Sequence, residues 1–263
     1  MLRKENVAEA KKYLEKIVKE KEIPGCSVLI VDQGEESLYF DCGFSDLEHE
    51  IPFKRDAICR LFSVSKVFTT IAIHKAIELG LLAKSNLLSD FLPAFKNPKV
   101  LMEDGSLKEV ACPTIQDLLN MCAGFGYGEG ESGKAFEEVE KSNYRVSTFE
   151  FASLIAQNPL LYVPRTKRSY SLAADLLGEV IEKASRLRFS EFLDKYIFIP
   201  ANTKDMGFSL NDKQRKRLVP CYVKENGHWQ KMRRVGLGID INGKETLFES
   251  GGAGLFGTIG DVA

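Results

Sequence analysis

The sequence predicts an α+β fold in which an antiparallel sheet is flanked by helices and a helical subdomain is inserted into the sheet layer. Runs rich in β-branched and aromatic residues lie near both ends of the 263-residue chain, whereas its middle carries helical patterning. Hydrophobic residues make up 44% of the chain, which is enough to bury a full core. We therefore expect a single domain over residues 1–263, with 1–62 and 197–263 forming the α/β layer and 63–196 a mainly helical subdomain. Enzymes with two such parts often place their active site in the cleft between them.

An amphipathic helix followed by a hairpin is expected at the N-terminus. The helix places these apolar side chains on one face at helical spacing: Val7, Tyr13, Leu14, Ile17 and Val18. Pro24 and Gly25 then end it. Residues 26–31 and 38–44 are two β-rich runs joined across a polar turn, which is typical of an antiparallel hairpin.

A long helix is expected next, over residues 63–79. Its residues are almost all apolar or small, and Gly80 supplies a natural C-terminal cap. A helix that is apolar nearly all round is usually buried in the centre of a domain, so we expect His74 to be a core histidine.

Further helices and a return to strands complete the pattern. Helical patterning recurs in five segments separated by Gly- and Pro-containing loops: 115–121, 135–141, 148–157, 172–185 and 189–196. Strand character returns at 218–223, 228–232 and 235–241, with turn signals at Asn226-Gly227 and Asn242-Gly243. The order of sheet, helices and sheet predicts the inserted helical subdomain.

Charge and terminal composition exclude several classes of protein. The chain has 36 Lys and Arg against 37 Asp and Glu, so its formal charge of -1 gives no electrostatic surface for nucleic acid or anionic lipid. The charged N-terminus has no apolar signal-peptide core, and no apolar run reaches membrane length. We therefore expect a cytoplasmic protein without nucleic-acid or membrane partners.

Cysteines, histidines and glycines give no sign of a metal or nucleotide site. The six cysteines form no C-x-x-C pair and the three histidines are far apart in sequence, so neither a zinc site nor a redox motif is indicated. Cys26 and Cys42 lie on neighbouring expected strands, but free thiols are the expected state. The G-x-G-x-x-G pattern at 128–133 follows no strand and contains two glutamates, so a glycine-rich loop is favoured over a phosphate site.

The chemistry centres on the one S-x-x-K in the chain, Ser63 and Lys66, at the start of the long apolar helix. Residues three apart share a helix face, so the lysine amine can approach the serine hydroxyl, which needs a base to become nucleophilic. The helix N-terminus favours an oxyanion, and together with burial it favours a neutral Lys66 that accepts a proton. By itself the motif is also compatible with a helix-capping serine and an exposed lysine.

Residues 62–66 and the apolar helix after them resemble the first motif of the serine β-lactamase and penicillin-binding protein superfamily. The likeness is to the class C β-lactamase-like branch, which includes family VIII carboxylesterases and D-amino-acid peptidases. Residues 164–178 are similar to its second motif, in which Tyr170 matches the tyrosine that faces the serine. Similarity at 118–124 and 250–256 extends the resemblance over nearly the whole chain. It implies a β-lactamase/transpeptidase-like fold with Ser63, Lys66 and Tyr170 as catalytic residues.

The chain departs from that family pattern at three places. Leu172 stands where class C enzymes have Asn, which is closer to the esterases and peptidases and leaves Ser171 as the polar alternative. Arg165 occupies a position that is commonly Gly. Cys122 and Ala123 stand where a pair of hydroxyl residues is usual.

The family's third motif, a Lys- or His-containing triad ending in Gly on a core strand, has no match before Ala263. In the family that strand forms one wall of the cleft and supplies the second oxyanion-hole N–H. We therefore expect the chain to be truncated at its C-terminus, to lack central strands, and to have doubtful activity in this form.

The expected function is acyl transfer by a serine hydrolase. Ser63 would attack a carbonyl while Lys66 and Tyr170 transfer protons to and from it. The two residues are assigned this role jointly, because two closely coupled groups titrate as a pair. The expected substrates, in loose order, are a small ester, a D-amino-acid peptide and a β-lactam, and no metal or organic cofactor is required. The alternative is a catalytically silent penicillin-binding-like protein that holds a peptide or partner at the same place.

Overall fold

The computed structural model describes residues 3–102, 104–127 and 131–263. The helices are α1 (Lys4–Lys19), α2 (Ser65–Glu78), α3 (Leu88–Phe91), α4 (Ile115–Leu119), α5 (Glu131–Lys141), α6 (Thr148–Ala156), α7 (Ala173–Ser185), α8 (Phe189–Leu193), α9 (Asp212–Arg215) and α10 (Ile259–Val262). The strands are β1 (Gly25–Asp32), β2 (Glu35–Asp46), β3 (Ile51–Pro52), β4 (Cys59–Arg60), β5 (Lys99–Leu101), β6 (Leu107–Glu109), β7 (Tyr222–Glu225), β8 (His228–Lys231) and β9 (Phe256–Gly257). The glycine-rich stretch at 128–133 begins outside the described residues.

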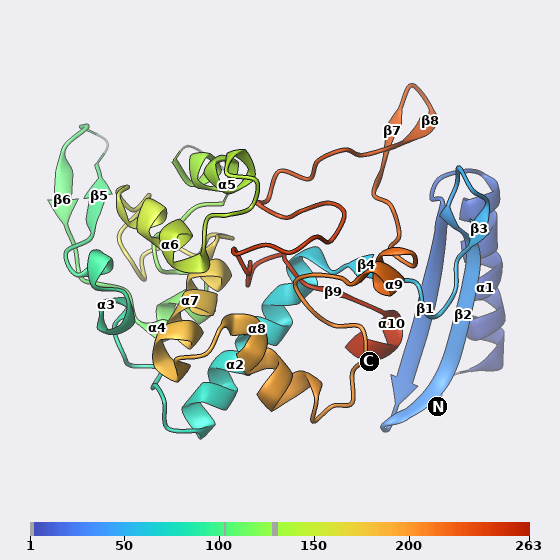
Figure 1. The fold of residues 1–263 in the computed structure, drawn as a ribbon, viewed down its shortest axis with the longest axis horizontal. Helices are drawn as coiled ribbons and strands as arrows, with labels where there is room; N and C mark the ends of the chain where they lie inside the picture. The colour runs from blue at the N-terminus through green and yellow to red at the C-terminus, as the bar shows by residue number, and fades with distance from the viewer. Residues whose placement is uncertain (1–2, 103, 128–130) are drawn as a thin grey trace.

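The N-terminal part is the expected helix on a hairpin. Strands β1, β2 and β3 form one antiparallel sheet, and α1 lies against it at one end of the molecule (Figure 1). Cys26 pairs directly with Cys42 across β1 and β2, with the two thiols free and 3.6 Å apart. Tyr13 was expected on the apolar face of α1, but it is 61% exposed. The face of α1 that packs against the sheet is therefore narrower than predicted.

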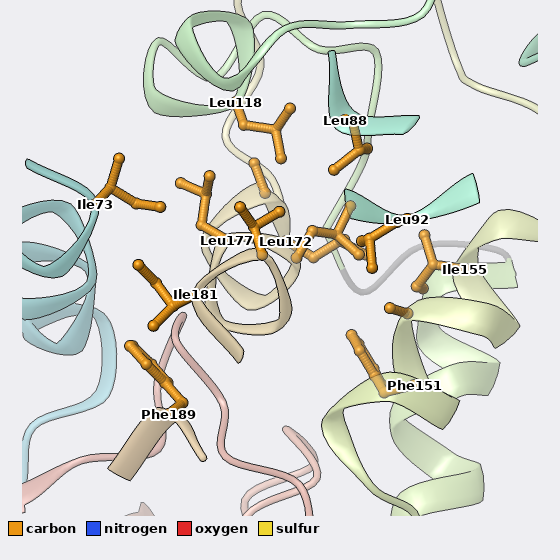
Figure 2. Packing of buried hydrophobic residues seen from close by; sticks show 14 of the residues in the cluster. Ile73, Leu88, Leu92, Leu118, Phe151, Ile155, Leu172, Leu177, Ile181 and Phe189 are labelled. Carbon is orange, nitrogen blue, oxygen red and sulfur yellow. The ribbon is translucent and has the colours of Figure 1, made fainter. Parts of the chain in front are cut away.

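The helical part surrounds one large apolar core. Ile73 of α2 faces Leu177 and Ile181 of α7, with α4 and α6 on the other side of α7 (Figure 2). The core continues into an aromatic group in which the rings of Phe151 and Phe248 lie 4.3 Å apart. Figure 1 shows α2 crossing the centre of the molecule, between this helical part and the β1–β2–β3 sheet.

Two expectations about α2 were wrong. Its inner face is buried, but Val67 and Ile71 are 55% and 44% exposed, so the helix is covered on one side only within the described residues. His74 lies on the exposed side, where its Nδ1 is 2.9 Å from the Thr70 carbonyl oxygen, and is therefore not a core histidine. Continuous apolar composition cannot show which face of a helix is covered.

The C-terminal strands differ in part from expectation. Strands β7 and β8 form a two-stranded hairpin that projects from the body of the molecule (Figure 1), and β7 begins only at Tyr222, after Pro220. Residues 235–241 form no strand, because Gly236 and Gly238 adopt left-handed φ angles of +76° and +65° that interrupt an extended run. The α+β class is confirmed, whereas the division into 1–62 with 197–263 and 63–196 stays a prediction.

Candidate active site

Ser63 lies at the junction between a short strand and the central helix. Strand β4 pairs with β9, the Leu61 N–H donates to the Leu255 carbonyl at 2.8 Å, and Ser63 follows in a short 3-10 helix, η1 (Phe62–Val64). Phe62 has a left-handed φ of +44°, a conformation that costs a non-glycine residue about 1 kcal/mol or more. The turn leaves the Ser63 side chain exposed at the start of α2.

Lys66 lies one helical turn after the serine and contacts four groups. Its Nζ is 3.3 Å from Ser63 Oγ and donates to the Gly252 carbonyl at 2.7 Å. It also lies 5.0 Å from the centre of the Tyr127 ring and 4.7 Å from that of the Tyr170 ring. A carbonyl acceptor and two aromatic faces are contacts that a cationic ammonium makes favourably.

Tyr170 completes the group from a different part of the chain. Its hydroxyl donates to Ser63 Oγ at 2.6 Å, and backbone bonds from Ser169 N–H to the Met121 carbonyl and from Leu172 N–H to the Gly126 carbonyl hold its loop. Burial raises the pKa of Tyr170, but its contacts with Lys66 and Ser63 outweigh burial and leave that pKa below the ordinary value. The structure thus brings all three sequence-predicted residues within contact of one another.

Arg165 shows how the loop before Tyr170 tolerates a side chain where the family commonly has Gly. Its φ of +70° lies in the left-handed region that favours glycine. Its Nε donates to both oxygens of buried Asp117 at 2.9 and 3.0 Å. Burial raises the pKa of Asp117, but hydrogen bonds from Thr114 and Arg165 outweigh burial and lower it. This ion pair supports the strained loop.

Neither residue after Tyr170 offers a polar group to the serine. Leu172 is 1% exposed and belongs to the core. Ser171 is also buried, with its Oγ 3.4 Å from the Met121 sulfur, so it does not replace the Asn of class C enzymes.

A cavity of about 680 Å³ lies apart from these residues. Its lining includes residues from 188–190, 208–215 and 244–249, and none of the three catalytic candidates lines it.

Three residues at the site were missed by sequence reasoning: Tyr127, Asp175 and Gly252. Asp175 lies in the first turn of α7, is fully buried, and accepts hydrogen bonds from Ser250 Oγ at 2.5 Å and Gly252 N–H at 3.0 Å. The segment that it holds runs along α2, where Thr69 Oγ1 donates to the Gly251 carbonyl at 2.7 Å. Resemblance at 250–256 pointed to this segment but not to its contact with Lys66.

Among the described residues, no group of His, Cys and carboxylate side chains near Ser63 is close enough together to share a metal ion. The one His and carboxylate group close enough to share an ion, within the described ranges, is Asp46, Glu48 and His49 on the N-terminal sheet and the turn after it. The Lys231 amine already supplies positive charge there, at 3.0 Å from Asp46 and 2.9 Å from Glu48.

No helix in the described part of the chain is both long and apolar enough to cross a membrane.

The chain resembles esterases and β-lactamases of known structure or sequence. Esterase EstB from Burkholderia gladioli is 28% identical in an alignment of 266 residues, and the aligned region covers 93% of this chain and 65% of the esterase. The structure of EstCE1, described as a hydrolase with promiscuous acyltransferase activity, matches 98% of this chain and 71% of its own with a TM-score of 0.82 at 25% identity. A class C β-lactamase from Rhodobacter sphaeroides shares the fold at 19% identity, with a TM-score of 0.70 over 97% of this chain and 63% of its own.

Family assignment rests on a match over almost the whole chain. An uncharacterized protein from Mycobacterium tuberculosis is 24% identical over 202 residues, which cover 74% of this chain and 50% of that protein. The chain thus spans about half to two thirds of the length of these curated relatives. The Beta-lactamase family model matches residues 10–263. The β-lactamase/transpeptidase-like fold expected from the motifs is confirmed, and the chain belongs to the Beta-lactamase family.

Proposed function

We propose that this protein is a serine hydrolase that works through an acyl-enzyme on Ser63. One observation carries the proposal: Ser63 Oγ lies 2.6 Å from the Tyr170 hydroxyl and 3.3 Å from Lys66 Nζ. A serine hydroxyl in contact with a group that can accept its proton is an arrangement that covalent catalysis uses, and here two such groups touch it. Relatives named as an esterase and as a hydrolase with acyltransferase activity support the same class of chemistry.

In the proposed mechanism, the Tyr170 and Lys66 pair removes the Ser63 proton as Oγ forms a bond to the substrate carbonyl carbon. The carbonyl π electrons move to oxygen, and the Ser63 N–H at the start of α2 donates to that oxyanion. Collapse of the intermediate breaks the bond to the leaving group, which takes the proton from the pair. Water then attacks the acyl-enzyme by the same steps in reverse order and frees Ser63.

Small esters are the favoured substrates, ahead of D-amino-acid peptides and β-lactams. A peptide or β-lactam needs polar groups to orient the amide groups around its scissile bond, and the side chains after Tyr170 are buried in the core instead. An alcohol leaving group also needs less help from a general acid than an amine. This ranking and the cytoplasmic location remain part of the proposal.

Covalent labelling tests the proposal and separates it from a silent binding protein. The chain is incubated with a fluorophosphonate and with a fluorescent penicillin, and the adduct is located by intact-mass and peptide mass spectrometry. We expect one adduct on Ser63, no adduct in Ser63→Ala, and severely slowed labelling in Lys66→Ala. Ser106→Ala, which changes an exposed serine on the β5–β6 turn, is the matched control and should label normally.

Two outcomes would count against the assignment. Retained labelling in Ser63→Ala would show that another residue is the nucleophile. Absence of any adduct, both in this chain and in the full-length gene product, would favour the silent protein that binds a peptide or partner at this place.

A further inference from the structure

We infer that Asp175 is a positioning residue for Lys66, acting through the backbone of Gly252 and through its own negative charge. The inference rests on the proposed function, in which Lys66 and Tyr170 together remove the Ser63 proton. It concerns a residue that touches neither the nucleophile nor the tyrosine. Asp175 is 1% exposed and sits on α7, whereas Lys66 sits on α2.

A short chain of contacts joins the carboxylate to the amine. Asp175 Oδ1 accepts from Gly252 N–H at 3.0 Å, and the carbonyl of the same glycine accepts from Lys66 Nζ at 2.7 Å. Asp175 Oδ1 also accepts from Ser250 Oγ at 2.5 Å, and Ser250 Oγ in turn accepts from Ala253 N–H at 3.0 Å. The carboxylate therefore fixes the backbone on both sides of the carbonyl that holds the amine.

The packing at Gly252 leaves no room for a side chain. A Cβ built there would lie 2.5 Å from Asp175 Oδ2 and 3.0 Å from Oδ1. Glycine is required at this position because the carboxylate and the backbone approach so closely. Any larger residue must separate Asp175 from the segment that it holds, which moves the Gly252 carbonyl while keeping the charge.

The carboxylate supplies something that an amide of the same shape would not. An Asn could accept the same bonds from Ser250 and Gly252 through its Oδ1, so hydrogen bonding alone does not require Asp. Asp175 Oδ2 is buried without a hydrogen-bond partner among the described residues, which is costly for a group with only a structural role. Its charge interacts favourably with the Lys66 ammonium and with the first turn of α7.

The titratable groups around Asp175 come from three elements. Lys66 faces it from α2, Tyr127 from the segment before α5, and Tyr170 from the loop before α7. Burial and, to a smaller extent, the negative charge of Asp175 raise the pKa of Tyr127, and burial raises the pKa of Asp175 itself. The same charge opposes the lowering of the Tyr170 pKa by Lys66 and Ser63. On α7 the next buried carboxylate, Glu179, lies 3.1 Å from Lys183 and serves as a matched comparison.

Two variants separate charge from position. Asp175→Asn keeps the bonds to Ser250 and Gly252 and removes the charge, so we expect the acidic limb of the pH profile of acylation to move to lower pH by about one unit. Gly252→Ala keeps the charge and displaces the carbonyl, so we expect about a 10- to 100-fold loss of acylation rate with the limb unmoved. Glu179→Gln should change neither quantity. Thermal unfolding of each variant shows whether it is folded.

A second measurement does not depend on turnover. The pKa of Tyr170 is followed by ¹³C NMR of ring-labelled tyrosine, with the signal assigned by Tyr170→Phe, and it should fall in Asp175→Asn but not in Glu179→Gln. If the wild-type chain forms no acyl-enzyme and this pKa still falls, the proposed function fails and the role of the charge stands. An unchanged pKa and an unmoved limb in folded Asp175→Asn would overturn the role of the charge. Full acylation rate in folded Gly252→Ala would overturn the role of the backbone contact.

Discussion

Replacing Tyr170 by Phe removes one hydroxyl oxygen and leaves the rest of the site in place. That oxygen is the atom 2.6 Å from Ser63 Oγ, whereas the ring contacts with Tyr127 at 5.2 Å and with Lys66 at 4.7 Å need no hydroxyl. The side chain is 53% exposed, so the free energy of unfolding should change by no more than about 0.5 kcal/mol. A change in rate would therefore reflect chemistry and not folding.

The size of the effect follows from what remains. A positioned acid or base contributes about 10²- to 10⁴-fold, which is about 2.7 to 5.4 kcal/mol of activation free energy. Lys66 Nζ still lies 3.3 Å from Ser63 Oγ and can take part of the proton transfer. We therefore expect kcat/KM to fall by about 10²- to 10³-fold, at the lower end of that range.

The pH dependence gives a second readout. Because the pKa of Tyr170 is lowered, the wild-type rate should rise with pH through a value below the ordinary tyrosine pKa of about 10. The Phe variant should lose that rise. Initial rates of p-nitrophenyl ester hydrolysis measure both quantities, with Tyr13→Phe on α1 as a control that should behave as wild type. A Phe variant with wild-type kcat/KM and an unchanged pH profile would refute the role of the hydroxyl.

Three further predictions concern stability. Phe151→Ala empties a fully buried position beside Phe248 and should cost about 3 to 5 kcal/mol in denaturant unfolding, so a loss below 1 kcal/mol would contradict the packing. Oxidation by glutathione disulfide should form a disulfide between Cys26 and Cys42, and their two protons pass to the two glutathione thiols that are released. The new disulfide should raise the free energy of unfolding by up to about 3 kcal/mol. An unchanged number of free thiols after oxidation would contradict this prediction. Burial and a neighbouring carboxylate raise the pKa of Glu182 to about 7. The contribution of Glu182 to the free energy of unfolding is therefore full below a pH of about 4.3, its unfolded pKa, and is lost as the pH rises through 7. Glu182→Gln should therefore gain stability relative to wild type at pH 8 but not at pH 4, and an equal difference at both would contradict the shift.

The parts of the site that sequence could predict are those set by short spacing. Ser63 and Lys66 meet because residues three apart share a helix face, and one motif contains both. Tyr170 is 107 residues from Ser63, so only resemblance to a family could link the two. Asp175 stands in an otherwise apolar helix start, and its partners Ser250 and Gly252 are 75 and 77 residues away. No local pattern records such a contact.

The errors in the fold have the same origin. Residues 235–241 are rich in strand-forming side chains, but two glycines in left-handed conformation decide their path. Composition also predicted a fully buried α2, whereas exposure of Val67 and Ile71 depends on which other segments reach that face. Hydrophobic periodicity predicts elements, and it does not predict how completely each is covered.

The contact between Lys66 and Gly252 can form only late in the synthesis of the chain. The two residues are 186 positions apart, and closing a flexible loop of that length costs about 4 to 5 kcal/mol of chain entropy. At ribosomal rates of about 5 to 20 residues per second, Gly252 is made about 10 to 40 seconds after Lys66. Nascent chains thus carry the serine, and later the tyrosine, without the carbonyl that holds the amine. Sequence distance alone therefore delays completion of the Lys66 contacts until late in synthesis.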